Sequence, residues 1–169
     1  MRLKILTLAA AALFLAACGS SSKESADVLG GGSDSPPVTA ENMMPSDAGL
    51  DPTSQEYLVV NIGDRVFFDY DRSDIKAEAQ VLLDQVSVWM QTYPAITLSI
   101  EGHCDERGTR EYNLALGERR ASSVNDYLVA LGIEPGRLST ISFGKERPAV
   151  LGSNASSWAQ NRRGVLVVN

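Results

Sequence analysis

The sequence contains only one histidine and two cysteines in 169 residues, and both scarcities restrict its chemistry. A disulfide scaffold needs several cysteines, and a catalytic Cys–His pair normally brings together distant parts of a chain. His103 and Cys104 are instead neighbours at the expected end of a strand, where successive side chains point to opposite sides. A metal site would need further ligands at a recognisable spacing, which the sequence does not offer. We therefore expect no catalytic site, no metal and no cofactor.

The chain also has no excess of basic residues, with 15 Lys and Arg against 21 Asp and Glu. Proteins that bind nucleic acid usually have a strong basic excess, so a nucleic-acid partner is disfavoured. The acidic surplus is concentrated in residues 18–56, which hold seven acidic residues and one basic residue, Lys23. The remainder of the chain is nearly balanced in charge.

The hydrophobic run from Ile5 to Ala17 is too short for a membrane-spanning helix, which needs about 20 apolar residues. Two basic residues precede it, and this pattern is typical of a secretory signal. Its end, Leu15-Ala16-Ala17-Cys18, resembles a bacterial lipobox, in which the cysteine is acylated and the chain is cut just before it. We expect residues 1–17 to be removed and Cys18 to carry lipid. Cys104 then remains as a single thiol, best explained as a packing residue.

Residues 18–56 are rich in Gly, Ser, Pro and Asp and contain no aromatic residue. Such a segment has too little apolar surface to offset the entropy of ordering, so it is expected to be a disordered tether. From Tyr57 the composition becomes globular, and the remaining length suits one domain. The expected organisation is a signal peptide (1–17), a lipidated cysteine with its tether (18–56) and one folded domain (57–169).

Within that domain, alternating and helical hydrophobic patterns predict strands over residues 57–62, 65–70, 96–102, 138–143 and 164–168. Helices are predicted from Ser73 or Asp74 to Thr92 and over residues 111–131, with a helical turn near 156–160. Their buried faces are expected to comprise Ile75, Ala79, Leu82, Val86 and Trp89 on the first, and Leu114, Gly117, Ala121, Val124, Leu128 and Leu131 on the second. The order β-α-β-α-β-β predicts a two-layer α/β sandwich, with helices on one face of a small mixed sheet.

The stretch EGHCDERGTREYNLALGERRA, residues 101–121, holds the main candidate site. Asp105 directly follows a strand, and Arg120 lies on the next helix, seven residues after Asn113. Opposite charges held in this way suit a ligand that carries both an amine and a carboxylate. From spacing alone, solvated charges closed by an ordinary ion pair are the commoner explanation. A self-neutralising turn is accepted for three neighbouring residues, Glu106, Arg107 and Arg110.

Four motifs in order, GHCDERGTREYN, LGERRA, FGKERPAVLG and NRR before the last strand, closely resemble the OmpA-like peptidoglycan-binding domain family. The resemblance spans about residues 58–169. It implies a domain that holds the peptide stem of the cell wall without a covalent bond, chiefly through diaminopimelate. By this resemblance Asp105 meets the ammonium group and Arg120 the carboxylate. It also implies that Asn113, Arg162, Phe68 and Asp69 line the pocket.

The resemblance further implies that acylated Cys18 sits in the outer membrane, with the domain in the periplasm. Gly19 lacks the aspartate that typically retains such lipoproteins in the inner membrane. TolB and other Tol components, which couple the envelope layers during division, are the implied partners. Two alternatives stay open. A peptidoglycan hydrolase or amidase would require a catalytic pair or a metal, and an adaptor that binds only TolB would not bind the wall.

Overall fold

The computed structural model describes residues 49–169, so the expected signal peptide, Cys18 and most of the tether lie outside the described part. Four strands form one sheet in the order β1-β4-β2-β3. They are β1 (Arg65–Phe67), β2 (Leu98–His103), β3 (Leu138–Gly144) and β4 (Arg163–Val168). β4 is antiparallel to both neighbours and β2 is parallel to β3, which confirms a mixed sheet.

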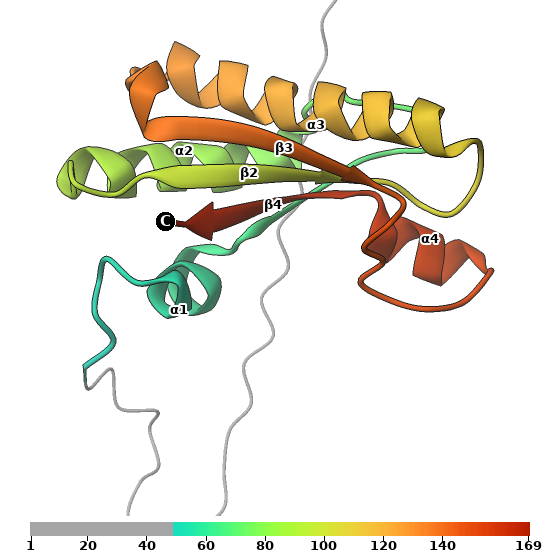
Figure 1. The fold of residues 1–169 in the computed structure, drawn as a ribbon. Helices are drawn as coiled ribbons and strands as arrows, with labels where there is room; N and C mark the ends of the chain where they lie inside the picture. The colour runs from blue at the N-terminus through green and yellow to red at the C-terminus, as the bar shows by residue number, and fades with distance from the viewer. Residues whose placement is uncertain (1–48) are drawn as a thin grey trace, which may run out of the picture. The chain divides into compact units, whose positions relative to one another are not determined.

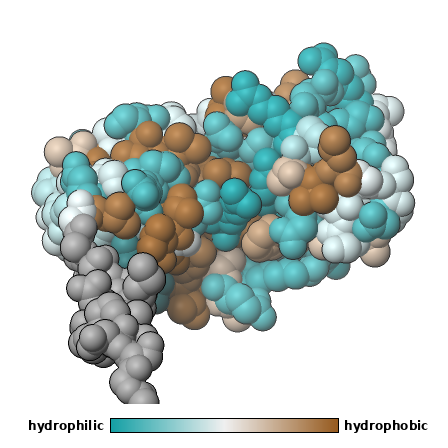
Figure 2. Space-filling view, turned by 90° about the horizontal axis from the view of Figure 1, so that it is seen from below, coloured by the Kyte–Doolittle hydropathy of each residue, from teal (hydrophilic) through white to brown (hydrophobic). Residues whose placement is uncertain are grey.

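Two long helices, α2 (Ala77–Thr92) and α3 (Arg110–Ala130), cover one face of this sheet (Figure 1). The two-layer α/β architecture is therefore as predicted. The core between the layers is apolar, and its fully buried side chains include Leu83, Val86, Leu98, Ile100, Val124, Leu128 and Leu166. Figure 2 shows hydrophobic side chains on the outside as separate patches among hydrophilic atoms.

A pair of glycines lets α3 lie against the sheet. A Cβ atom on Gly102 would lie 1.9 Å from the carbonyl oxygen of Gly117, and one on Gly117 would lie 2.3 Å from the Ser142 hydroxyl. Both distances are far below van der Waals contact, so neither position accepts a side chain without a shift of backbone. The expected close approach at Gly117 is confirmed, and Gly102 is its partner on β2.

The predicted strand over residues 57–62 is wrong. The chain forms α1 (Gln55–Tyr57) followed by a π-helical turn, η1 (Leu58–Ile62). The β-branched Val59 and Val60 favoured a strand, but both are largely exposed, whereas Leu58 is fully buried. The Ser54 hydroxyl caps α1 by accepting the Tyr57 N–H. The folded part also begins before Tyr57, because the Trp89 indole donates to the carbonyl of Pro52.

The segment between β1 and α2 also differs from the prediction. β1 ends at Phe67 rather than near residue 70, and α2 begins at Ala77 rather than Ser73 or Asp74. The Arg120 guanidinium donates to the carbonyls of Asp69 and Arg72, at 3.0 and 2.8 Å. Those carbonyls are therefore engaged by a distant side chain, and the segment stays a loop.

The buried face of α3 is as predicted for Gly117, Ala121, Val124 and Leu128. Leu114, however, is 45% exposed and Leu131 is half-buried, while the buried stripe also includes Asn113, Leu116 and Arg120. A helical pattern read from apolar residues alone misses two polar members of that stripe, Asn113 and Arg120. Both therefore point into the domain rather than lying beside its buried face.

The remaining elements are η2 (Pro135–Arg137) and α4 (Ala155–Asn161). Figure 1 shows α4, the start of α3 and the carboxyl ends of β2 and β3 at the same end of the domain. Within residues 49–169, no helix is long and apolar enough to cross a membrane. The end of the sheet that gathers these loops is where the predicted site residues lie.

Candidate ligand-binding site

A cavity of about 190 Å³ opens at the carboxyl end of β2, below the start of α3. It is smaller than the roughly 300–1,000 Å³ of pockets for drug-sized ligands, and its size suits one group of amino-acid dimensions. Its lining residues are Tyr70, Asp71, Cys104, Asp105, Arg107, Gly108, Tyr112, Asn113, Leu116, Arg120 and Arg162. Four of the six residues predicted for the site, Asp105, Asn113, Arg120 and Arg162, are brought together here.

Asp105 lies at the base of this cavity, with only 4% of its side chain exposed. One carboxylate oxygen, Oδ1, accepts the Arg107 backbone N–H and its Nε–H, both at 3.1 Å. The other oxygen, Oδ2, accepts Arg107 Nη2 at 2.6 Å and Arg162 Nη1 at 3.3 Å. Burial alone raises the pKa of Asp105, but these hydrogen bonds outweigh it, so the pKa is lowered and the carboxylate stays charged.

Arg120 is fully buried and makes no ion pair with a carboxylate within the described residues. Its guanidinium donates to three backbone carbonyls, those of Asp69, Arg72 and His103, and to the Cys104 sulfur. Burial lowers the pKa of this guanidinium. Asp105 and Arg120 thus do not close on each other as an ordinary ion pair. Arg120 is thus a cation on one wall of the cavity, and its hydrogen-bond partners among residues 49–169 are all uncharged.

Arg162 and Asn113 fix the surrounding loops. Arg162 Nε donates to the Phe68 carbonyl at 3.0 Å while its Nη1 reaches Asp105. The Asn113 amide donates to the carbonyls of Arg107 and Thr109, at 2.8 and 3.0 Å. These bonds connect β4, the strand end after β1 and the loop before α3 into one wall.

Phe68 and Asp69 were also predicted to line the pocket, but neither is among the residues that line this cavity. Their backbone carbonyls accept from Arg162 and Arg120, and the Phe68 ring lies 5.2 Å from the Arg120 guanidinium carbon. The Asp69 carboxylate points to Lys76 Nζ at 2.5 Å. In this geometry the two residues position the arginines rather than facing the cavity themselves.

Four other residues line the cavity without having been assigned to the site: Tyr70, Asp71, Arg107 and Tyr112. Tyr70 and Asp71 end the motif Phe67-Phe68-Asp69-Tyr70-Asp71, expected mainly to form core and helix caps, with one residue able to wall a pocket. Arg107 was interpreted as part of a self-neutralising turn. Asp71 has φ of 58°, and it is the one non-glycine residue with positive φ in the described part. Such backbone geometry gathers at functional sites. The Tyr112 hydroxyl donates to the Asp71 carboxylate, which joins α3 to the loop before α2. No sequence pattern signals that contact, because it joins residues 41 positions apart.

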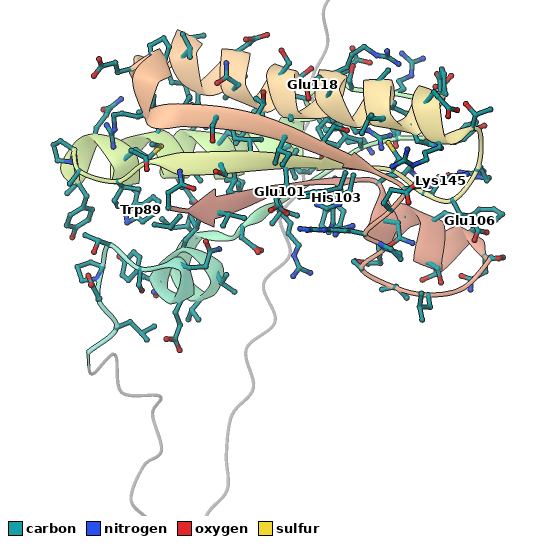
Figure 3. The ribbon with its side chains drawn as sticks, viewed as in Figure 1. Trp89, Glu101, His103, Glu106, Glu118 and Lys145 are labelled. Carbon is teal, nitrogen blue, oxygen red and sulfur yellow. The ribbon has the colours of Figure 1, made fainter. Side chains whose placement is uncertain are left out.

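His103 and Cys104 are both buried beside the site. Burial raises the pKa of the Cys104 thiol. Burial, with Arg163 and Arg147 nearby, lowers the pKa of His103 to about 4. Figure 3 shows His103 and Glu101 together on the sheet, and Glu106 and Lys145 at the end that holds α4. Residues 49–169 include no cluster of three His, Cys, Asp or Glu side chains placed to hold a metal.

Comparison with known proteins places this geometry in a family context. The OmpA family model matches residues 67–162. A peptidoglycan-associated lipoprotein of Rhizobium meliloti is 53% identical over 117 residues, covering 69% of this chain and 66% of that protein. One from Pasteurella multocida is 39% identical over 164 residues, covering 96% of this chain and 95% of that protein.

Solved structures give the same picture of the fold. The crystal structure of the peptidoglycan-associated lipoprotein from Burkholderia pseudomallei is 39% identical, with a TM-score of 0.65, and covers 70% of this chain and 100% of its own. The C-terminal domain of Helicobacter pylori MotB is 19% identical, has a TM-score of 0.59 and covers 63% of this chain and 84% of its own. At that identity the second likeness concerns the fold alone.

Proposed function

Because the chain belongs to the OmpA family, and within it to the peptidoglycan-associated lipoproteins, we propose that it binds peptidoglycan non-covalently through the diaminopimelate of the stem peptide. It is a peptidoglycan-binding lipoprotein of the cell envelope and not an enzyme. Asp105, Asn113, Arg120 and Arg162 are the proposed contact residues, with Phe68 and Asp69 in support.

The observation that carries this proposal is the state of Arg120. It is a fully buried cation that faces a cavity and has no carboxylate partner within residues 49–169. A buried charge without an opposite charge is costly, and a ligand carboxylate entering the cavity relieves that cost. Nη2 of the guanidinium donates to one carbonyl only, so it keeps an N–H for a ligand carboxylate, and such a charge-assisted hydrogen bond is short and strong.

The other end of the ligand supplies an ammonium group, and Asp105 is the proposed acceptor. Its carboxylate is buried, ionised and lines the same cavity as Arg120. A cation and an anion lining one cavity favour a zwitterion over a simple amine or a simple acid, because only the zwitterion offers an opposite charge to both Arg120 and Asp105. The amino-acid end of diaminopimelate has this chemistry.

Anchoring and partners form a second part of the proposal. Lipid on Cys18 holds the chain in the outer membrane while the domain binds the wall from the periplasm, so the two layers are linked. We propose that this link works within the Tol–Pal system, with TolB as a partner, in envelope integrity and cell division. The lipobox at residues 15–18 and the name shared by the relatives support this part.

The test is retention on purified peptidoglycan sacculi, with free small molecules as competitors. Wild-type protein is expected to sediment with sacculi, and meso-diaminopimelate is expected to release it. Pimelate lacks the ammonium groups and cadaverine lacks the carboxylates, so neither should compete at the same concentration. Equal competition by all three compounds, or no retention at all, would contradict the proposed site.

Two further measurements separate the alternatives. Asp105→Asn removes the negative charge with little change of shape, and it should lose retention while circular dichroism stays unchanged. A hydrolase would release muropeptides from sacculi during incubation, and we expect none. An adaptor that binds only TolB would leave the wild-type protein in the supernatant.

A further inference from the structure

The Asp105 carboxylate, which is proposed to receive the ligand ammonium, already has hydrogen bonds at all of its lone-pair positions. A carboxylate offers about four lone-pair positions, and Asp105 accepts four hydrogen bonds. Three come from Arg107, through its backbone N–H, Nε and Nη2, and one comes from Arg162. An ammonium group therefore cannot reach this carboxylate until one of these donors leaves.

Arg107 is the donor placed to leave. Its side chain is 33% exposed, whereas that of Arg162 is 15% exposed and is also tied to the Phe68 carbonyl. Its guanidinium lies between two aromatic rings, 4.0 Å from the centroid of Tyr70 and 4.1 Å from that of Trp158. When the side chain swings out, one position is freed on each oxygen of Asp105, while the backbone N–H bond remains.

We infer that Arg107 is a displaceable latch: its guanidinium occupies the ammonium position of the site, and a ligand must replace it on Asp105 to bind. When the site is empty, the latch pairs with the Asp105 carboxylate and occupies its ammonium position. It also sets selectivity, because a ligand that opens it has to replace the two side-chain hydrogen bonds that Arg107 gives up. This inference rests on the proposed function and names the step that the ligand must overcome.

The latch makes a prediction opposite to that for a contact residue. Arg107→Gln removes the competing charge, so binding of free meso-diaminopimelate, measured by calorimetry on the purified protein, should tighten by about tenfold. Arg110→Gln is the matched control. Arg110 lies three positions further along the chain, at the start of α3, and pairs with exposed Glu146, so its loss should leave the affinity unchanged.

The fluorescence of Trp158 should report directly on the departure of the Arg107 guanidinium. The chain has two tryptophans, and Figure 3 shows Trp89 far from Glu106, whose carboxylate accepts from the Trp158 indole at 3.0 Å. In a Trp89→Phe background, meso-diaminopimelate should change the Trp158 emission as the guanidinium leaves the ring. With Arg107→Gln added, that change should be absent although binding persists. If Trp89→Phe does not fold, the same comparison between wild type and Arg107→Gln gives the difference signal.

The outcomes separate the latch from the proposed function. Tighter binding by Arg107→Gln, or binding by this variant alone, supports the latch. Weaker or equal binding overturns it, since Arg107 would then stay in place, with the ammonium meeting another carboxylate such as Asp71. Retention of the wild type on sacculi without any effect of Arg107→Gln removes the latch and keeps the proposed function. Loss of sacculus binding by both proteins removes both.

Discussion

Two buried arginines lie near the same end of the sheet, yet only one lines the cavity. Arg120 is fully buried and Arg163 is 7% exposed, and neither forms an ion pair within residues 49–169. Burial lowers the pKa of both guanidiniums. Arg163 donates to the carbonyls of Asn161 and Arg147, at 3.3 and 3.2 Å, and is not among the cavity residues.

Burial of a cation is therefore not enough, by itself, to identify a binding site. Both guanidiniums tie loops together through backbone carbonyls, which is a structural role. Arg120 adds something that Arg163 lacks, namely an accessible cavity beside it and an ionised carboxylate, Asp105, on another wall. The proposed binding function therefore concerns the first residue, while the contacts of the second are those of a structural residue.

The largest expected effect comes from replacing each arginine by methionine, which keeps the apolar part of the side chain. Arg120→Met should weaken binding to sacculi by about 1,000-fold, because removing one partner of a buried, hydrogen-bonded charge pair costs about 2–5 kcal/mol. Arg163→Met should change binding by less than about threefold, while lowering the free energy of unfolding in urea. Equal losses of binding in the two variants would remove the distinction drawn between them.

The next effect concerns the close contact between β2 and α3, the helix that carries Arg120. Gly102→Ala places a methyl group against the Gly117 carbonyl, so it should lower the free energy of unfolding by about 3 kcal/mol or more. Gly136→Ala is the control, because the nearest atom is the Glu134 carboxylate oxygen at 4.0 Å. Thermal unfolding followed by circular dichroism measures both. A near-neutral Gly102→Ala would show that α3 can move away from β2 without cost.

The smallest effect is a pH dependence of the free energy of unfolding. It comes from His103, whose side chain lies on the other side of β2 from Arg120. In the fold the pKa of His103 is about 4, against 6.5 for the free side chain. Between these values the unfolded chain binds a proton that the folded protein does not. The free energy of unfolding should therefore fall as pH drops from about 6.5 to 4, by at most about 3 kcal/mol.

His103→Gln should abolish that slope in urea titrations at pH 7, 5.5 and 4.5. Burial is the main cause of the low His103 pKa, the charges of Arg163 and Arg147 add to it, and a backbone hydrogen bond with Arg147 opposes it. Asp105 behaves differently, because its lowered pKa gives stability that is lost only below about pH 4. A slope that persists in His103→Gln would assign the dependence to another group.

Local patterns predicted much of the fold. Alternation of apolar residues located β2, β3 and β4, and helical spacing located α3 to within a residue or two at each end. The failures have physical causes. Val59 and Val60 have strand propensity, but Leu58 packs into the core and draws the segment into α1 and η1. The loop before α2 keeps its form because Arg120, far along the chain, donates to its carbonyls.

The residues of the candidate site were likewise predicted only in part from the sequence. The sequence pointed to Asp105 and Arg120 from a strand end and a helix, and family motifs added Asn113 and Arg162. It indicated only that one residue of the run from Phe67 to Asp71 could wall a pocket, and the structure shows that Tyr70 and Asp71 are the ones that reach the cavity. It also treated Arg107 as a solvated charge. Arg107 stacks between Tyr70 and Trp158, and no local pattern signals this contact because the three residues come from separate segments of the chain.

The elements whose side chains repeat with the period of a strand or helix, and the charges near one strand end, can therefore be recognised in the sequence alone. Which of those charges are buried, which are paired and which face a cavity depends on the tertiary structure. The reason is that burial and pairing depend on contacts between residues far apart in the chain. Arg120 illustrates both parts: its position on α3 follows from periodicity, while its unpaired state inside the protein follows from packing.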